Sequence, residues 1–410
     1  MPQWRLWLRR IARRIWFRAA LISALSVVLA LASAWLAPLI PYEFSLKIGS
    51  DSVDNILTIL ASSMLAVTTF SLTAMVAAFS RAAQQVTPRA TQLLIEDKTA
   101  QNALSTFLGA FLFAIVGIIA LSADAYGAQG RVILYIGTIA LIVWIAFTLL
   151  RWIAALTNFG RVDNAIQRIE EAAVEAIKRR HGPILLAGEA ELDPPAGVPT
   201  IAAPATGYVT LIDRTVLARC AREAGVRVTI CAPAGHMVSR GQALAWTSQP
   251  VDEEGAEAMA AAFAIEAERT FEEDPRFAMI VLAEIGSRAL SPAVNDPGTA
   301  IAALNAGQRI LEALADTAAR PADCDLLVDP PLALAAMAED LVLPIARDGA
   351  KTAEVGIRLQ HMLGAVANEV PPAAGSTRRL ADDALERARR GEVAPTVRDR
   401  IERAQRTAFG

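Results

Sequence analysis

Residues 132–150 read VILYIGTIALIVWIAFTLL, nineteen consecutive positions without a charged side chain. As a helix, a stretch of this length crosses a hydrocarbon core of about 30 Å. Three earlier stretches are equally free of charge, at 19–40, 56–79 and 103–123. An amphipathic helix of a soluble protein would carry a charged face, which these stretches lack. The pattern predicts four transmembrane helices within residues 19–156.

The composition of the whole chain agrees with this prediction. Of its 410 residues, 54% are hydrophobic and 20% are charged, whereas soluble domains average about 45–50% and about 25%. A disordered chain and a purely soluble protein are therefore not expected. The net charge of −3 argues against a nucleic-acid-binding protein. With three cysteines and three scattered histidines, we expect no disulfide framework, no metal site and no cofactor.

The first apolar stretch allows a second interpretation. Six arginines precede it within residues 1–18, and Ala32-Ser33-Ala34 is typical of a signal-peptide cleavage site. The apolar run continues to Leu39 beyond that site, which favours an uncleaved membrane helix. Residues 1–18 also interleave the arginines with tryptophan, leucine and isoleucine. This segment is either an amphipathic helix in the headgroup region or an ordinary basic anchor.

The basic residues that flank the helices predict the orientation of the chain. Six arginines precede the first helix, and the fourth is followed by Arg151, Arg161, Arg168 and further cations. The loop before the second helix carries only Lys47 beside acidic residues. We therefore expect both termini, and the whole region after the fourth helix, to lie in the cytoplasm.

The predicted fold class is a mainly α membrane protein with a cytoplasmic α+β region. By composition, the cytoplasmic region divides into four parts. Residues 157–182 predict an amphipathic helical stalk, packed either on its own domain or on another subunit. Residues 200–248 alternate short β-branched runs with glycine turns, which indicates a small β-barrel-like module. Residues 252–370 return to a helical pattern. Residues 371–410 have few large apolar groups and predict a charged tail, either a solvated helix or disordered.

The predicted module resembles the biotinyl- and lipoyl-type barrels, in which glycines form the turns between short strands. Gly207, Gly235 and Gly241 carry this resemblance. Those carrier domains attach their cofactor to a lysine, and residues 201–247 contain none. The module is therefore interpreted as a structural barrel without a cofactor.

Several strings of residues resemble a known family. They are Val53-Asp54-Asn55-Ile56-Leu57, Thr87-Pro88-Arg89, Glu273-Asp274-Pro275-Arg276-Phe277 and Ser291-Pro292-Ala293-Val294-Asn295-Asp296-Pro297-Gly298-Thr299-Ala300. The family is domain of unknown function 2254, predicted bacterial membrane proteins, and the likeness runs from about residue 20 to 365. This resemblance implies a multi-pass protein of the bacterial inner (plasma) membrane, and it implies no particular activity.

Small and hydroxyl side chains form a stripe along the second apolar stretch. They recur at steps of three and four and so share one helix face: Thr58, Ser62, Ala66, Thr69, Thr73, Ala77 and Ser80. Hydroxyl groups on one face can line a pore and solvate a passing ion or water. Small residues on one face also allow neighbouring helices to pack closely. The pore-lining candidates are Thr58, Ser62, Thr69, Thr73 and Ser80.

A second group of polar residues lies in the cytoplasmic region. Its members share one predicted helix end and the loop after it: Glu284, Arg288, Ser291, Asn295 and Asp296. One interpretation is a polar ligand pocket. The other is a structural corner, in which Asp274 and Asp296 cap helices that begin at Pro275 and Pro297.

The sequence shows no recognisable catalytic arrangement. Ser291 has no neighbouring histidine, and no phosphate-binding loop motif occurs. The apolar stretches also lack the charged groups that proton-coupled carriers need at membrane depth. We therefore expect a non-enzymatic, homo-oligomeric, passive pore or channel-like protein that contacts lipids and conducts a small ion or solute. The alternative is a membrane-anchored scaffolding or ligand-sensing module without conduction.

The predicted orientation can be tested with reporter fusions. A reporter after Gly410 should be active in the cytoplasm, and one inserted between residues 41 and 54 should be active on the outer side of the membrane. The basic N-terminus is the physical reason, because cationic flanks stay on the cytoplasmic side. The reverse pattern would contradict the orientation.

Overall fold

The structure is a computed structural model. It describes residues 50–90, 98–123, 128–158, 161–188, 192–317, 325–390 and 394–410, with isolated positions between 20 and 28 and at 93. The chain forms two compact units, residues 1–164 and 165–410. The predicted N-terminal segment 1–18 lies outside the described residues, as does the predicted helix 19–40 apart from those isolated positions.

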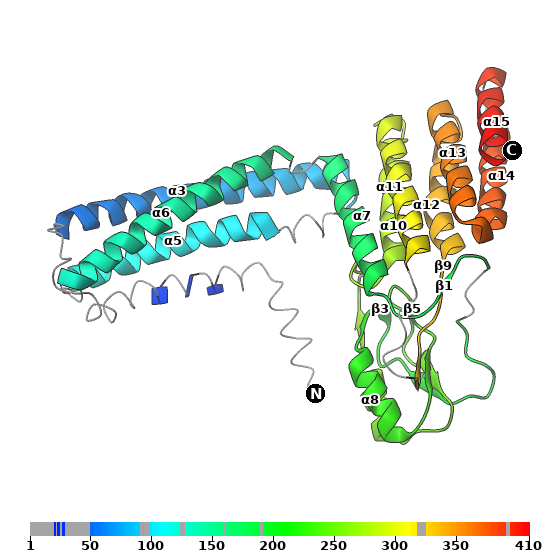
Figure 1. The fold of residues 1–410 in the computed structure, drawn as a ribbon, viewed down its shortest axis with the longest axis horizontal. Helices are drawn as coiled ribbons and strands as arrows, with labels where there is room; N and C mark the ends of the chain where they lie inside the picture. Colours follow the sequence, from blue (N-terminus) through cyan, green and yellow to red (C-terminus); the bar gives the residue numbers. More distant parts are fainter. Residues whose placement is uncertain are drawn as a thin grey trace. The chain divides into compact units, whose positions relative to one another are not determined.

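In the described part of the first unit, three long helices lie side by side (Figure 1). They are α3 (Ser50–Gln85), α5 (Lys98–Ser122) and α6 (Ala128–Asn158). Within the described residues, the three spans long and apolar enough to cross a membrane are Ser52–Ser80, Thr99–Ser122 and Gly130–Leu156. The second, third and fourth predicted helices are thus confirmed as apolar helices of the required length.

Large apolar side chains fill the contact between these helices. Leu57 of α3, Phe107 and Phe113 of α5, and Leu134 and Trp152 of α6 are almost completely buried there. The opposite faces expose large apolar side chains, among them Ile59, Phe70, Val76, Ile142, Trp144 and Phe147. An apolar exposed surface is what a helix needs where it faces lipid instead of water.

The predicted stalk forms helix α7 (Val162–Arg179), separate from α6, which ends at Asn158. One face of α7 is buried: Ala165, Ile166, Ile169, Ala173, Ala176 and Ile177. Glu170 of α7 forms an ion pair with Arg309 of α11 (Pro297–Asp316), with 2.5 Å between Oε2 of Glu170 and Nη2 of Arg309. Burial within its own chain favours the first alternative for the stalk, packing on its own domain.

The expected barrel-like module forms two open sheets instead of a closed barrel. One sheet has the order β2-β6-β4-β8 and the other β5-β3-β7. The bounds are Thr200–Ala202 (β2), Gly207–Ile212 (β3), Val228–Ile230 (β4), Met237–Val238 (β5), Ala243–Thr247 (β6), Phe263–Glu266 (β7) and Leu327–Val328 (β8). The barrel prediction is not confirmed because β7 and β8 come from beyond residue 248 and continue the sheets.

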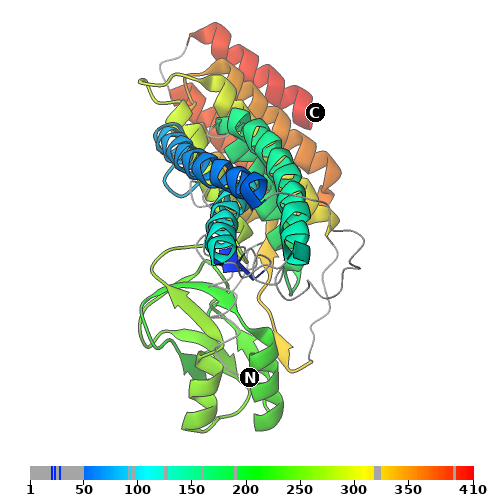
Figure 2. The same ribbon diagram turned by 90° about the vertical axis from the view of Figure 1, so that its left-hand side faces the viewer.

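The two sheets share one hydrophobic core, to which two helices contribute. Val209 of β3, Ile230 of β4 and Leu244 of β6 are buried in it together with Leu217 and Met259. Those last two residues belong to α8 (Arg214–Ala224) and α9 (Glu253–Ala260). The module is therefore a small sandwich with its helices alongside it (Figure 2).

From α10 onward, the described residues of the second unit form helical hairpins that pack on one another (Figures 1 and 2). The hairpins pair α10 with α11, α12 with α13, and α14 with α15, and each packs on the next. Their bounds are Pro275–Ala289 (α10), Leu334–Asp348 (α12), Ala353–Glu369 (α13), Ala374–Arg390 (α14) and Pro395–Phe409 (α15), with a short 3₁₀ turn at Pro371–Ala373. A parallel pair, β1 (Ile184–Leu185) and β9 (Leu332–Ala333), joins the chain after α7 to the start of α12.

The C-terminal region is a packed hairpin, not a solvated tail. Leu385 and Ala388 of α14 and Ile401 of α15 are buried in one cluster with Ile357 of α13 packed against it. Alanines supply much of the buried face of α14. Residues 371–410 pack despite having few large apolar groups, because small side chains let these helices approach closely.

Gly364 of α13 shows how close that approach is. A Cβ atom at this position would lie 2.5 Å from the Cβ of Ala408 in α15 and 2.7 Å from its carbonyl oxygen. We predict that Gly364→Ala displaces α15 at a cost of about 1–3 kcal/mol, because overpacking forces the backbone to move. Limited trypsin digestion should then cleave α15 faster than in the wild type.

The control is Gly375→Ala in α14, where the nearest atom to a Cβ is Nη1 of Arg379 at 4.0 Å. This variant should digest like the wild type. Equal digestion of wild type and Gly364→Ala would contradict the described packing of α15.

Candidate functional site

The hydroxyl stripe of the second predicted helix lies on the exposed face of α3. Within the described residues Thr58, Ser62, Thr69, Thr73 and Ser80 are all exposed, as are the two alanines of the stripe, Ala66 and Ala77. The opposite face of the same helix is buried against α5 through Val53, Leu57, Leu60, Met64 and Met75. The stripe is therefore not the surface by which α3 packs on α5.

Three of the stripe hydroxyls are bonded to their own helix. Ser62 donates to the carbonyl of Thr58, Thr69 to that of Leu65, and Thr73 to that of Thr69, each over 3.0 Å. This back-bonding satisfies the donor of each hydroxyl and leaves its oxygen lone pairs facing outward. This side of α3 consequently presents hydroxyl oxygens without any formal charge, beside the exposed apolar side chains of Ile59, Phe70 and Val76.

The second group of predicted site residues forms a capped corner between α10 and α11. Asp296 accepts from the backbone nitrogen of Thr299 over 3.1 Å and from its hydroxyl over 2.6 Å. These bonds lower the pKa of Asp296 below its ordinary value. Pro297 is the first residue of α11, and Asn295 has φ +50°, a left-handed conformation that asparagine tolerates. The capping role predicted for Asp296 is confirmed.

The other members of that group do not enclose a cavity with Asp296. Arg288, Asn295 and Asp296 are exposed, while Glu284 and Ser291 are partly buried. None of the five lines the cavity described below. The structure thus brings Ser291, Asn295 and Asp296 together in one tight turn, and the polar-pocket interpretation gains no support from it.

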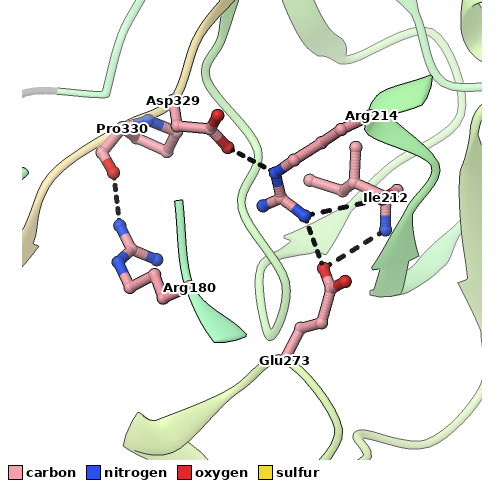
Figure 3. A network of polar contacts seen from close by, with 6 residues as sticks. All are labelled: Arg180, Ile212, Arg214, Glu273, Asp329 and Pro330. Atoms are coloured by element: carbon pink, nitrogen blue, oxygen red, sulfur yellow. Dashed lines mark hydrogen bonds and ion pairs between the residues drawn. The ribbon is translucent and has the colours of Figure 1, made fainter. Parts of the chain in front are cut away.

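A buried ion-pair network lies between the sandwich and the helical stack (Figure 3). Arg214, the first residue of α8, contacts Glu273 (Nη1 to Oε2, 3.1 Å) and Asp329 (Nε to Oδ1, 2.8 Å). Burial alone would lower the pKa of Arg214, but the two carboxylates raise it above its ordinary value. The side chain of Asp329 is only 3% exposed. One guanidinium therefore joins α8, the loop before α10 and the segment after β8.

Arg180, directly after α7, lies beside this network. It donates to the carbonyl oxygen of Pro330, and its Nε is buried without a partner among the described residues. Burial lowers the pKa of Arg180 to about 10, although nearby Asp329 acts in the opposite direction. Arg180 is thus a desolvated cation whose neighbouring carboxylates are bonded elsewhere.

A second buried pair fixes the start of α10. Asp274 accepts from the backbone nitrogen of Phe277 over 3.1 Å and pairs with Arg269, whose Nη2 lies 2.6 Å from Oδ2. Burial raises the pKa of Asp274 above its ordinary value despite that arginine. Asp274 is the predicted cap, with Pro275 as the first helical residue, so this prediction is confirmed.

Sequence motifs single out only some of the residues of the ion-pair network. Glu273 and Asp274 belong to a conspicuous string, but Arg214 and Asp329 stand 115 positions apart and carry no motif. Arg180 is one cation among several after the fourth apolar stretch. No local signal distinguishes these three residues, because the fold alone brings them together.

A comparison with protein families identifies the chain. The model for domain of unknown function 2254, described as a predicted membrane protein, matches residues 12–365. The chain belongs to this family. The match covers the apolar helices and the second unit up to α13. Neither the curated proteins nor the solved structures contain a match to this member of the family.

The ion-pair network predicts that two arginine substitutions lower the free energy of unfolding by unequal amounts. Arg214→Met leaves Asp329 buried without its cation, which typically costs about 3–5 kcal/mol. The matched control is Arg309→Met, because that side chain is 54% exposed and its pair with Glu170 is worth about 0–1 kcal/mol. The denaturation midpoint of the purified protein in detergent measures both. Equal losses in the two variants would show that the network has no special role.

Proposed function

We propose that this protein is a homo-oligomeric, passive pore of the bacterial inner membrane, with α3 lining the path. The observation that carries the proposal is the outward position of the hydroxyl stripe on α3. The cytoplasmic unit would hold the copies together, and no catalytic step is involved.

The two faces of α3 support this assignment. One face buries Leu57 and Met64 against α5, and the other presents Thr58, Ser62 and Thr69 outward within the described residues. Hydroxyl groups facing lipid gain nothing, since hydrocarbon offers no partner for their lone pairs. Copies arranged around an axis would instead turn this face toward a shared aqueous path.

The chemistry of the stripe suits water or a small cation. Each bonded hydroxyl presents oxygen lone pairs, which can replace part of the hydration shell of a cation. The spans Ser52–Ser80, Thr99–Ser122 and Gly130–Leu156 contain few ionisable groups, and Asp54 lies at the end of its span. A proton relay or a voltage sensor would need such groups at membrane depth. We therefore infer passive conduction.

The second candidate function is a membrane-anchored ligand-sensing or scaffolding module. It is favoured by the cavity of about 320 Å³ in the cytoplasmic unit. In that case the stripe would pack against another helix, and no solute would cross. Conduction by the purified protein separates the two candidates.

The pore proposal is tested by substitutions at Thr69 near the middle of α3. Thr69→Leu replaces a hydroxyl by a bulky apolar group, which creates a constriction that can dewet. We expect conductance across a planar bilayer to fall at least tenfold, whereas Thr69→Ser keeps the hydroxyl and should conduct like the wild type. The matched control is Thr148→Leu on α6, where a hydroxyl is also bonded to its own helix, to the carbonyl of Trp144.

Two results would overturn the proposal. The first is the absence of any ion or solute flux through the wild-type protein under voltage or membrane tension. The second is an equal loss of conductance in Thr69→Leu and Thr148→Leu, because it would show that α3 has no special place in the path. Size-exclusion chromatography of each variant should show the wild-type assembly, so that loosened packing is recognised.

A further inference from the structure

The cavity of about 320 Å³ lies in the second unit, between the sandwich and the helical stack. Its wall combines Arg180, Ala234 from the loop after β4, Glu273 to Arg276 at the start of α10, and Ala333 and Ala336 at the start of α12. Ligand sites for small molecules measure about 300–1,000 Å³, so this cavity fits a compact ligand.

Three carboxylates line the cavity: Glu273 and Asp274 are bonded to other cations, and Glu339 is exposed. Glu273 pairs with Arg214, Asp274 pairs with Arg269, and Asp340 holds Arg276 through two bonds of 2.7 and 3.0 Å. Asp329 shares Arg214 with Glu273. These pairs leave Arg180 as the lining cation that no carboxylate bonds directly within the described residues.

Arg180 is therefore the group that a ligand could satisfy. A guanidinium carries five N–H donors, and among the described residues only the carbonyl of Pro330 accepts from this one. An arginine that is desolvated and incompletely bonded gains strongly from an oxyanion, because charge-assisted hydrogen bonds strengthen where water is excluded.

The start of α12 also favours the binding of an anion in this cavity. This helix of 15 residues begins after Ala333, no side chain caps it, and Ala333 and Ala336 line the cavity. The backbone N–H groups of a first helical turn carry partial positive charge and attract anions. The wall also has an apolar part, formed by Leu192, Pro233, Pro275, Pro331 and Leu332.

We propose that this cavity binds a small organic anion, with a carboxylate or phosphate group on Arg180 and an apolar body against the proline and leucine wall. The site is distinct from the α3 stripe and from the corner at Asp296. It does not depend on the pore proposal, since binding to the cytoplasmic unit can be measured without conduction.

The test is calorimetric titration of the purified full-length protein in detergent. Phenyl phosphate and benzoate carry the two anionic groups on a similar apolar ring, and benzyl alcohol is the uncharged analogue. We expect at least one of the anions to bind saturably and at least tenfold more tightly than benzyl alcohol. The tighter of the two anions identifies the preferred charged group.

Two variants locate the binding. Arg180→Gln should weaken the tighter anion at least tenfold, whereas Arg309→Gln, an arginine of an exposed ion pair away from the cavity, should bind like the wild type. Ala336→Glu keeps Arg180 but places a carboxylate in the first turn of α12, where an acidic residue suits the helix. It should abolish binding even if Arg180→Gln does not fold.

Three outcomes would overturn the proposal. They are no saturable binding of either anion, equal binding of benzyl alcohol, and unchanged affinity in a folded Arg180→Gln or Ala336→Glu variant. Failure of conduction in the bilayer experiment would leave these binding results unaffected, so the two proposals can fail separately.

Discussion

Hydrocarbon provides no hydrogen-bond partners, and each polar group of α3, α5 and α6 must therefore be satisfied within the protein. Long uninterrupted helices meet this requirement for the backbone. The hydroxyls of α3 meet it by donating to carbonyls one turn earlier, as Ser62, Thr69 and Thr73 show. What this bonding leaves over is a row of oxygen acceptors on the face opposite α5. The lack of hydrogen-bond partners in hydrocarbon thus explains the long helices, and it is also the reason why a row of exposed oxygen acceptors points to a function.

The second unit, residues 165–410, is held together by a different set of interactions. Its sandwich and its helical stack each bury an apolar core, and the ion pairs of Arg214 connect the two. A buried guanidinium between Glu273 and Asp329 stabilises the fold only while all three partners are present, because one unpaired buried charge is costly. Arg180 lies beside this arrangement without a carboxylate of its own.

The sequence predicts those features that depend on local pattern. Uncharged apolar runs predict α3, α5 and α6, and an aspartate before a proline predicts the caps at Asp274 and Asp296. It does not predict the sandwich, since β7 and β8 join the sheets from residues 263–266 and 327–328. Nor does it predict the C-terminal hairpin, which buries a few large side chains such as Leu385 and Ile401 among alanines. The pair of Arg214 and Asp329 depends on the complete fold.

The most direct test of the central claim is an image of the purified protein in lipid nanodiscs by electron cryomicroscopy. The pore account predicts at least three copies around an axis, with Thr58, Ser62, Thr69 and Thr73 of each α3 facing a continuous opening. A particle in which another helix covers this face, with no opening along the axis, would contradict it.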